Sequence, residues 1–484
     1  MTFLVFSASK LPLIKNLFAN ISLIVLLNML VKPVWVLVEM EIQDQIGHGD
    51  WGLYSALFSL AFLLVALADI GINSFTAKTL ASDPTRLKAY FPNLFSVKIL
   101  AQFLYPVLMF GIGYLLGYRG EALYWLVLLS LTQAGLQFLQ FFRSSFQAGQ
   151  RFLLDGLFSI AERVILLVFV AYLFFTTLSV ERFLYVHLMT ISLVVVSAYV
   201  IFSSLYGWLR PRIDQKLLKR LVKESFPFLM MTILYSIHDK VDQVMLERMA
   251  GDEENGYYVA GYRWLDAFNM YLWTILPIFF ARFAFFLYQP KEQERLLHFG
   301  QIIAALPMLF VAGFVWFYGE YLLFPFDQSS PEELATILTC LKTIFLAAGL
   351  NGIFAIYSTY LTSTGHVRPV NYIVSGSILL NVILNIFLIP RYGAVACAWS
   401  TVISYTAMDL AYLLYIHFKA PVSVAFLNLL GLAVAGLGMF LTFWGLYALA
   451  TPWYVTSGLA GISLLAISRL WGLISWEKIR SFKL

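Results

Sequence analysis

The chain has 484 residues, of which 61% are hydrophobic and only 12% are charged. Soluble globular proteins carry about 25% charged residues, so this composition excludes a soluble protein and indicates an integral membrane protein. The net charge of +5 does not indicate nucleic-acid binding, because the basic residues are spread over the connections between apolar runs.

Continuous apolar runs predict about 14 transmembrane helices. About 20 apolar residues cross a bilayer as a helix, whereas a barrel strand needs about 9–11 residues of alternating polarity. No signal-peptide cleavage site follows the first run, so we expect it to be retained. The fold class is therefore all-α integral membrane, and the runs lie near residues 17–38, 51–73, 93–116, 122–142, 152–176, 183–206, 225–247, 256–281, 298–318, 334–361, 369–389, 394–417, 421–450 and 453–472.

The basic residues also predict an orientation. With the N-terminus in the cytoplasm, 22 Lys and Arg residues fall on the inner side and four on the outer side: Arg119, Arg182, Arg248 and Arg391. Cytoplasmic connections are enriched in Lys and Arg, so both termini are expected in the cytoplasm. The stretch "GWLRPRIDQKLLKRLVKE", residues 207–224, is then expected to be a basic cytoplasmic linker.

Two pairs of similar segments indicate an internal repeat. "DWGLY" (50–54) opens the second predicted helix and "ENGYY" (254–258) opens the eighth, while "FFRSSFQAGQRF" (141–152) corresponds to "IYSTYLTSTGHVRP" (356–369). An even number of helices per repeat gives both halves the same orientation, as in several transporter folds. The sequence predicts two pseudo-symmetric six-helix lobes, 1–206 and 225–417, followed by an extra helix pair and a cytoplasmic tail over 418–484.

Several charged residues remain inside the predicted helices. Each costs at least about 2.5–3.5 kcal/mol at the bilayer centre unless it faces water or a partner. They must line a cavity or form structural ion pairs, and both interpretations remain open. The basic members are Lys32, Lys98, Arg163, Lys240, Arg263 and Lys342, and the acidic ones are Asp69, Glu162, Asp239, Asp242, Asp266 and Asp409.

The segment "SIHDKVDQVMLER" (236–248) has the densest group of these charges. Thr232, Tyr235, Asp239 and Asp242 follow the spacing i, i+3, i+7, i+10, which places them on one face of a helix. This pattern is typical of a helix that lines a polar cavity.

Three segments resemble a known family. "GDWGLYSALFSLAFLLVALADIGIN" (49–73), "DQVMLERMAGDEENGYYVAGYRWLD" (242–266) and "NVILNIFLIPRYGAVACAWSTVISY" (381–405) are similar to polysaccharide or oligosaccharide-lipid flippases. These bacterial proteins belong to the multidrug/oligosaccharidyl-lipid/polysaccharide exporter superfamily. The resemblance covers the first twelve predicted helices. The lipid II flippase subgroup looks less similar, because its characteristic arginine pattern is not seen in the first two helices.

The resemblance implies two lobes around a V-shaped cavity that opens alternately to each side of the inner membrane. The implied substrate is an oligosaccharide on undecaprenyl diphosphate, turned from the cytoplasmic to the periplasmic leaflet, and the last two helices would form a groove for its lipid tail. The implied partners are this lipid-linked oligosaccharide, membrane lipids and polysaccharide assembly proteins. No nucleic acid is expected.

A diphosphate crossing a low-dielectric region needs cationic partners. We therefore predict substrate-binding roles for Arg263 and Lys240 first, then Lys32, and also for Lys342, Arg163 and Lys98. The acids Asp239, Asp242 and Asp266 are candidates for carrying a coupling ion, H⁺ or Na⁺. Asp69, within "LADIG", is expected instead to cap a helix or to make tertiary hydrogen bonds.

Three other functions fit the sequence less well. A drug or cation antiporter of the same superfamily would need an acidic cavity, whereas acids and bases are equal in number here. A membrane enzyme of glycan polymerisation would need a large outer catalytic loop, and the longest one predicted, about 318–334, is small. A structural scaffold would not explain the buried charges. The six His residues lack metal-ligand spacing, and no phosphate-binding Gly loop or catalytic triad is present, so neither enzyme activity nor a cofactor is expected.

Overall fold

The computed structural model describes residues 31, 33–69, 71–76, 87–149, 151–207, 212 and 214–474. All regular secondary structure in these residues is helical. Nine of the described helices are long and apolar enough to cross a membrane. A helix suits a bilayer because it satisfies every backbone hydrogen-bonding group within one segment. The predicted all-α, multi-pass membrane fold is confirmed.

The chain forms two compact units. The first contains the described residues up to Ile46 together with Leu53–Val241, and the second contains Gly47–Gly52 together with the described residues from Asp242. The predicted lobe boundaries and the cytoplasmic linker remain predictions.

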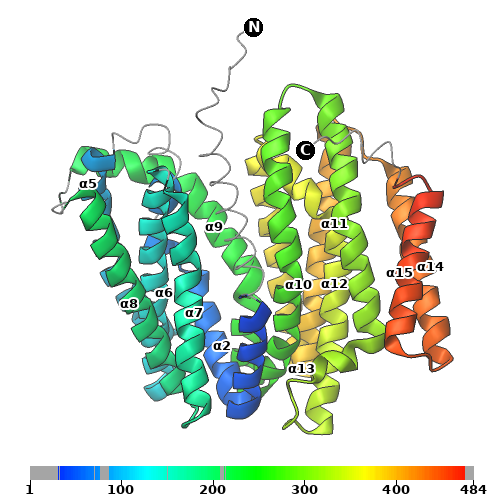
Figure 1. Cartoon of the computed structure of the whole chain (residues 1–484), viewed down its shortest axis with the longest axis horizontal. Coiled ribbons are helices and arrows are strands. Elements are labelled where there is room, and N and C mark those ends of the chain that lie inside the picture. The colour runs from blue at the N-terminus through cyan, green and yellow to red at the C-terminus, as the bar shows by residue number, and fades with distance from the viewer. Residues whose placement is uncertain are drawn as a thin grey trace. The chain divides into compact units, whose positions relative to one another are not determined.

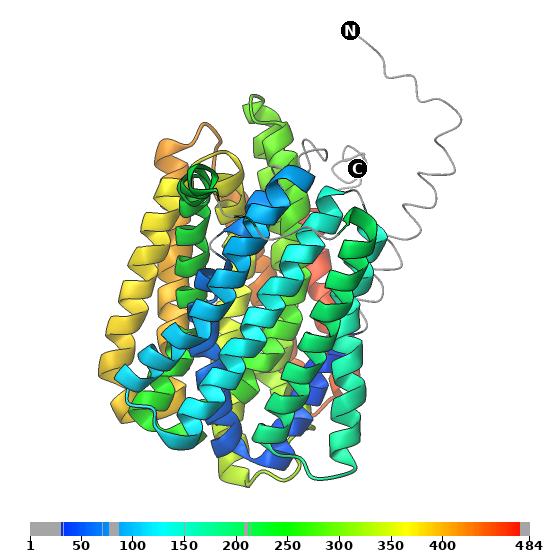
Figure 2. The same cartoon turned by 90° about the vertical axis from the view of Figure 1, so that its left-hand side faces the viewer.

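The first unit is a helical bundle around α6 (Gly120–Ala148), which packs against α5 (Leu87–Leu115), α7 (Phe152–Phe174) and α8 (Val180–Tyr206). Figures 1 and 2 show α6 and α8 running alongside each other. The core between α5, α6 and α8 consists largely of phenylalanine rings, and the rings of Phe91 and Phe202 stack with centroids 4.1 Å apart. The unit also contains a helix over residues 33–46 and the first part of α9 (Gln215–Ala250).

The prediction of one continuous second span was wrong. Residues 51–73 divide among α2 (His48–Leu63), α3 (Ala66–Asp69) and α4 (Ile72–Phe75). Gly71 precedes α4 with φ of 75°, a left-handed conformation that a helix cannot contain and that glycine adopts at little cost. The predicted span is therefore interrupted directly after Asp69, a residue that the sequence places within the membrane.

The first predicted connection also differs from expectation. Residues 39–50 separate the predicted runs 17–38 and 51–73, but helix continues from residue 33 to residue 46. No glycine interrupts the segment before Gly47, whose φ of 100° ends the helix. Glu39 and Asp44 are consequently buried rather than exposed.

The second unit is arranged around α12 (Pro331–Ser363), which packs against α10 (Asp252–Phe285), α11 (Pro290–Tyr318) and α13 (Val367–Lys419). The short 3₁₀ helix η4 (Gly319–Leu323) follows α11. The predicted C-terminal pair is present as α14 (Phe426–Ala448) and α15 (Trp453–Leu470), which pack against each other and against α11 (Figure 1).

The predicted eleventh and twelfth spans are joined in α13 by a kink at Gly393 (φ 54°, ψ −134°). Beside the kink, the Glu254 carboxylate accepts a hydrogen bond from the backbone N–H of Ala394 at 2.7 Å. The positive φ favours glycine at residue 393, and a Cβ atom there would also displace the Glu254 carboxylate from its hydrogen bond. Glu254 therefore caps the helix that restarts after the kink.

The repeated motifs "DWGLY" and "ENGYY" mark a close backbone contact within the second unit. A Cβ atom on Gly52 would overlap the carbonyl oxygen of Asp252, and one on Gly256 would overlap that of His48. The Asn255 side-chain amide donates to the carbonyl oxygen of Gly52 at 2.7 Å. Both glycines of the repeat are thus needed because two helix ends approach each other at this point.

We expect Gly52→Ala to lower the free energy of unfolding by about 1–3 kcal/mol, because its Cβ atom meets backbone that cannot move aside easily. Gly49→Ala is the matched control, since its Cβ atom would make an ordinary contact, 3.6 Å from Cγ of Glu253. Thermal unfolding in detergent compares the two. Equal melting temperatures would contradict the close contact.

Candidate functional site

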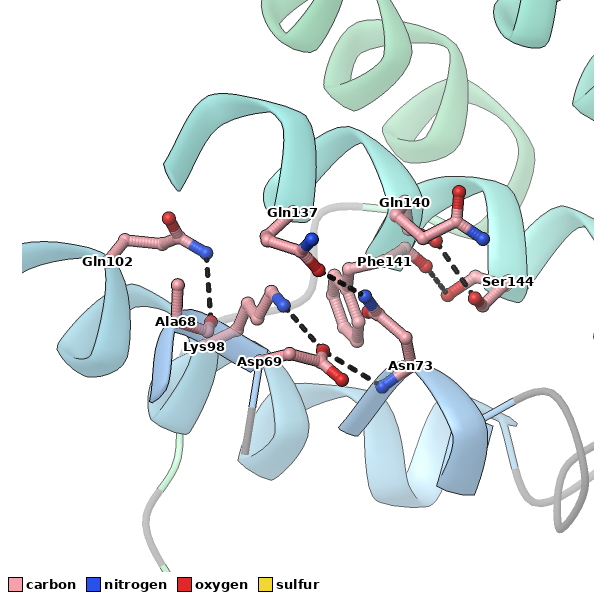
Figure 3. A network of polar contacts seen from close by, with 10 residues as sticks. Ala68, Asp69, Asn73, Lys98, Gln102, Gln137, Gln140, Phe141 and Ser144 are labelled. Atoms are coloured by element: carbon pink, nitrogen blue, oxygen red, sulfur yellow. Dashed lines mark hydrogen bonds and ion pairs between the residues drawn. The ribbon is translucent and has the colours of Figure 1, made fainter. Parts of the chain in front are cut away.

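The break after α3 is stabilised by a buried ion pair between α5 and the end of α3. Lys98 is fully buried, and its ammonium donates to Oδ1 of Asp69 at 2.7 Å (Figure 3). The same oxygen accepts from the backbone N–H of Asn73 at 3.2 Å. Asp69 therefore caps α4 and makes a tertiary bond, which confirms the role expected for it.

Amide side chains complete this network. Gln102 donates to the carbonyl oxygen of Ala68, and Asn73 donates to the side-chain oxygen of Gln137, both at 3.2 Å (Figure 3). A helix end leaves backbone groups without partners, and inside a membrane these must be satisfied by protein. Sequence analysis missed Gln102 and Gln137, although Gln102 lies one turn after Lys98 on α5. The substrate role predicted for Lys98 remains a prediction, and here its charge is held by Asp69.

A second group of charges joins α7, α8 and the helix over 33–46. Nε of Arg163 lies 3.3 Å from one carboxylate oxygen of Glu162, and Nε2 of His187 lies 3.3 Å from the other. The guanidinium carbon of Arg163 is 4.9 Å from the ring centroid of Trp35, a cation–π contact. Glu162 and His187 are buried, whereas Arg163 is about one third exposed. The sequence identified Arg163 as a cation at membrane depth but did not identify His187.

Helix α9 carries Lys240 and the first predicted coupling acid, Asp239. The Lys240 ammonium lies 3.3 Å from Oδ2 of Asp239, and their side chains are 11% and 40% exposed. Asp242 differs from Asp239 because it is buried. The two acids of the predicted polar stripe therefore lie in different surroundings.

Asp242 is held by hydroxyl groups from two other helices of the second unit. Its Oδ2 accepts from the hydroxyl of Tyr258 on α10 at 2.5 Å and from that of Thr401 on α13 at 3.3 Å. On α13, Asn385 donates to the side-chain oxygen of Asn381 at 3.0 Å, and its own side-chain oxygen is buried without a hydrogen-bond partner among the described residues. This polar group lies within otherwise apolar helices.

The sequence did not identify Tyr258 and Thr401 as partners of Asp242. Asn381 and Asn385, four residues apart in "NVILN", signalled only that one face of α13 is polar, because two amides in an apolar helix must find partners.

The remaining predicted residues have separate positions. Nη1 of Arg263 on α10 lies 3.9 Å from Oδ2 of Asp266, three residues later on the same helix, and both side chains are mostly buried. Lys342 on α12 is partly buried. Lys32 lies outside the described residues. Within the described part of the chain, Lys98, Arg163, Lys240 and Arg263 are each within 4 Å of a carboxylate.

The chain matches two known protein families. The family described as "Polysaccharide biosynthesis protein" matches residues 17–284, which is more than half of the chain. The chain belongs to this family. A second family, MatE, matches residues 288–387. No curated protein sequence matches the chain.

Solved structures show which fold this family member has. The lipid II flippase MurJ in an inward closed conformation aligns with a TM-score of 0.76 at 14% identity, covering 93% of this chain and 98% of MurJ. An inward-facing multidrug resistance MATE family transporter of the MOP superfamily aligns with a TM-score of 0.65 at 12% identity, covering 80% of this chain and 94% of that one.

A MOP superfamily transporter from Pyrococcus furiosus aligns with a TM-score of 0.59 at 14% identity, covering 83% of this chain and 95% of that one. The polysaccharide biosynthesis protein thus has the fold of MOP superfamily transporters, as the sequence predicted. At these identities the likeness concerns the fold alone.

Removing one partner of the Lys98–Asp69 pair should be strongly destabilising, because it leaves a buried charge uncompensated. We expect Lys98→Met and Asp69→Asn each to lower the free energy of unfolding by about 3–5 kcal/mol. The double variant should lose less than the sum of the two. A double-mutant cycle from thermal unfolding measures this coupling. Strictly additive losses would contradict the pairing.

Proposed function

We propose that this polysaccharide biosynthesis protein flips an oligosaccharide linked to undecaprenyl diphosphate from the cytoplasmic to the outer leaflet of a bacterial inner membrane. The substrate would then be available for cell-surface polysaccharide assembly. The observation that carries the proposal is that basic side chains within apolar helices are held by neighbouring acids, at distances from 2.7 to 3.9 Å. The family to which the chain belongs and the transporter fold support it.

Cations within the membrane can stabilise the negative charge of a diphosphate headgroup. The headgroup must leave water to cross the membrane, and a pre-existing cation lowers the cost of that step. Arg263 is the first candidate, because it lies within an apolar helix and its planar fork suits phosphate. Lys240 and Lys32 are the next candidates, followed by Lys342, Arg163 and Lys98.

The proposed arrangement in the membrane follows from the basic residues of the sequence. Both termini lie in the cytoplasm, since 22 basic residues would otherwise face outward. Helices α14 and α15 contact the polyprenyl tail, and assembly proteins receive the oligosaccharide on the outer side. The chain carries out transport and no covalent chemistry.

Transport is proposed to be coupled to H⁺ or Na⁺ through Asp242, with Asp239 and Asp266 as further candidates. Two hydroxyl groups and a buried carboxylate provide oxygen atoms that suit either a proton or a hard cation.

A drug or cation antiporter is the second candidate function. It is favoured by the MatE match over residues 288–387 and by the fold likeness to multidrug transporters. Proteoliposomes separate the two functions. We expect accelerated flipping of undecaprenyl-diphosphate oligosaccharide and no efflux of ethidium, and the reverse result would establish the antiporter.

We expect Arg263→Gln to weaken binding of the lipid-linked oligosaccharide by about 1.5–3 kcal/mol, the range for one hydrogen bond to a charged group. Arg263→Lys should recover only part of the loss, because ammonium lacks the bidentate fork. Binding and flipping are measured on purified, reconstituted protein.

The double variant Arg263→Gln/Asp266→Asn is the control for a purely structural pair, because the two residues lie 3.9 Å apart. If export recovers when both charges are removed together, the pair only holds the helix and Arg263 has no role in substrate binding.

We expect Asp242→Asn to abolish the pH or Na⁺ dependence of flipping while the protein still folds, because the amide cannot bind a proton or balance a cation in this site. Thr401→Val keeps the carboxylate and removes one of its hydroxyl partners, so it should shift the dependence without abolishing it. Flipping rates against pH and Na⁺ concentration provide the measurement. Unchanged dependence in both Asp242→Asn and Asp239→Asn would make these acids structural.

A further inference from the structure

Glu162 lies between two groups that compete for its negative charge. One carboxylate oxygen is 3.3 Å from Nε of Arg163 on the same helix, and the other is 3.3 Å from Nε2 of His187 on α8. The Glu162 and His187 side chains are only 7% and 6% exposed. One carboxylate can thus neutralise either of two neighbours, of which Arg163 is permanently charged and His187 is charged only when protonated.

His187 has a ring nitrogen that is available to accept a proton. Its Nδ1 atom is buried and has no hydrogen-bond partner among the described residues. The contact of Nε2 with Glu162 is at ion-pair distance but does not have hydrogen-bond geometry. The ring of Phe183 is a neighbour of His187, with centroids 6.0 Å apart, and it stacks on Trp35. A protonated His187 would therefore depend on Glu162 for its counter-charge.

The other charged groups on the packed helices are already engaged or lie at helix ends. Arg143 on α6 pairs with Asp155 on α7 at 2.8 Å. Glu181 and Arg182 lie in the first turn of α8, where Arg182 donates to the carbonyl oxygen of Thr177. The helix over 33–46 carries Glu39, Glu41 and Asp44 after Trp35, and α6 carries Glu121 in its first turn. Within the described part of the chain, Glu162 is the carboxylate at ion-pair distance from His187.

We propose that His187 binds a proton that transfers the counter-charge of Glu162 from Arg163 to His187, so that proton binding and anion binding by Arg163 favour each other. With neutral His187, Glu162 and Arg163 compensate each other. When His187 gains a proton, the group of Glu162, Arg163 and His187 has one net positive charge. If Glu162 then compensates His187, the uncompensated charge is that of Arg163, the most exposed of the three at 35%. A diphosphate at Arg163 restores neutrality, and by reciprocity a bound anion favours the proton. This inference rests on the proposed function, because it names the groups that regulate one of its anion sites.

The sign of the pH dependence follows. A proton on His187 strengthens the anion site, so the proposal predicts that anion affinity falls as the pH rises. While one linked proton titrates, affinity changes by up to about tenfold per pH unit.

The test uses the purified full chain in nanodiscs and undecaprenyl diphosphate without glycan as the probe, with dissociation constants measured from about pH 6 to about pH 8. The wild type should bind more weakly as pH rises. His187→Gln should give weak, flat binding, because Arg163 stays held by Glu162. Glu162→Gln should also flatten the profile but give tight binding at every pH, because Arg163 is never neutralised. Damage to folding cannot produce that gain in affinity.

His366→Gln is the matched control, because this histidine lies at the start of α13, where its Nδ1 is 3.0 Å from the hydroxyl of Thr364. It should keep the wild-type profile, including any titration of the diphosphate itself. A pH profile that persists in His187→Gln, or weaker binding by Glu162→Gln, overturns this inference and leaves the proposed function standing. Failure of the wild type to bind the probe at any pH overturns both.

Discussion

Charge compensation in a medium without water is the constraint on which this structure depends. Each ionised side chain among apolar helices must have a counter-charge or a set of hydrogen-bond donors, since the bilayer supplies neither. The protein uses both solutions. Lys98 and Asp69 neutralise each other, whereas Asp242 is stabilised by the hydroxyl groups of Tyr258 and Thr401. The positions of these groups in turn determine where helices break and which helices must touch.

The buried cations differ in how far they are open to an external partner. Lys98 is fully buried and lies 2.7 Å from Asp69 at a helix break, so its charge stabilises the fold there. Arg163 is about one third exposed and lies beside Trp35. A partly exposed cation can exchange its internal partner for an anion at a smaller cost than a fully buried one. On this ground Arg163 is a better candidate than Lys98 for contact with a moving substrate.

The fold was largely predictable because most transmembrane helices correspond to one continuous apolar run of the sequence. The break after α3 was not predictable, since residues 51–73 are apolar enough for one helix and the partners that stabilise the break, Lys98 and Gln102, come from α5. The same reasoning applies to the sites. Arg263 and Asp266 lie three residues apart on one helix, so sequence spacing places them on one face. Spacing gives no means of linking Glu162 to His187 or Asp242 to Thr401 across helices.

The broken second span also affects how the protein enters the membrane. α2 has 16 residues, short for a membrane crossing, and Asp69 follows it within the same predicted span. The lysine that neutralises Asp69 lies 29 residues later in the chain. During synthesis, therefore, this segment reaches the insertion machinery before its counter-charge exists. Its stable placement must wait for α5, so these helices should leave the translocon as a group rather than one at a time.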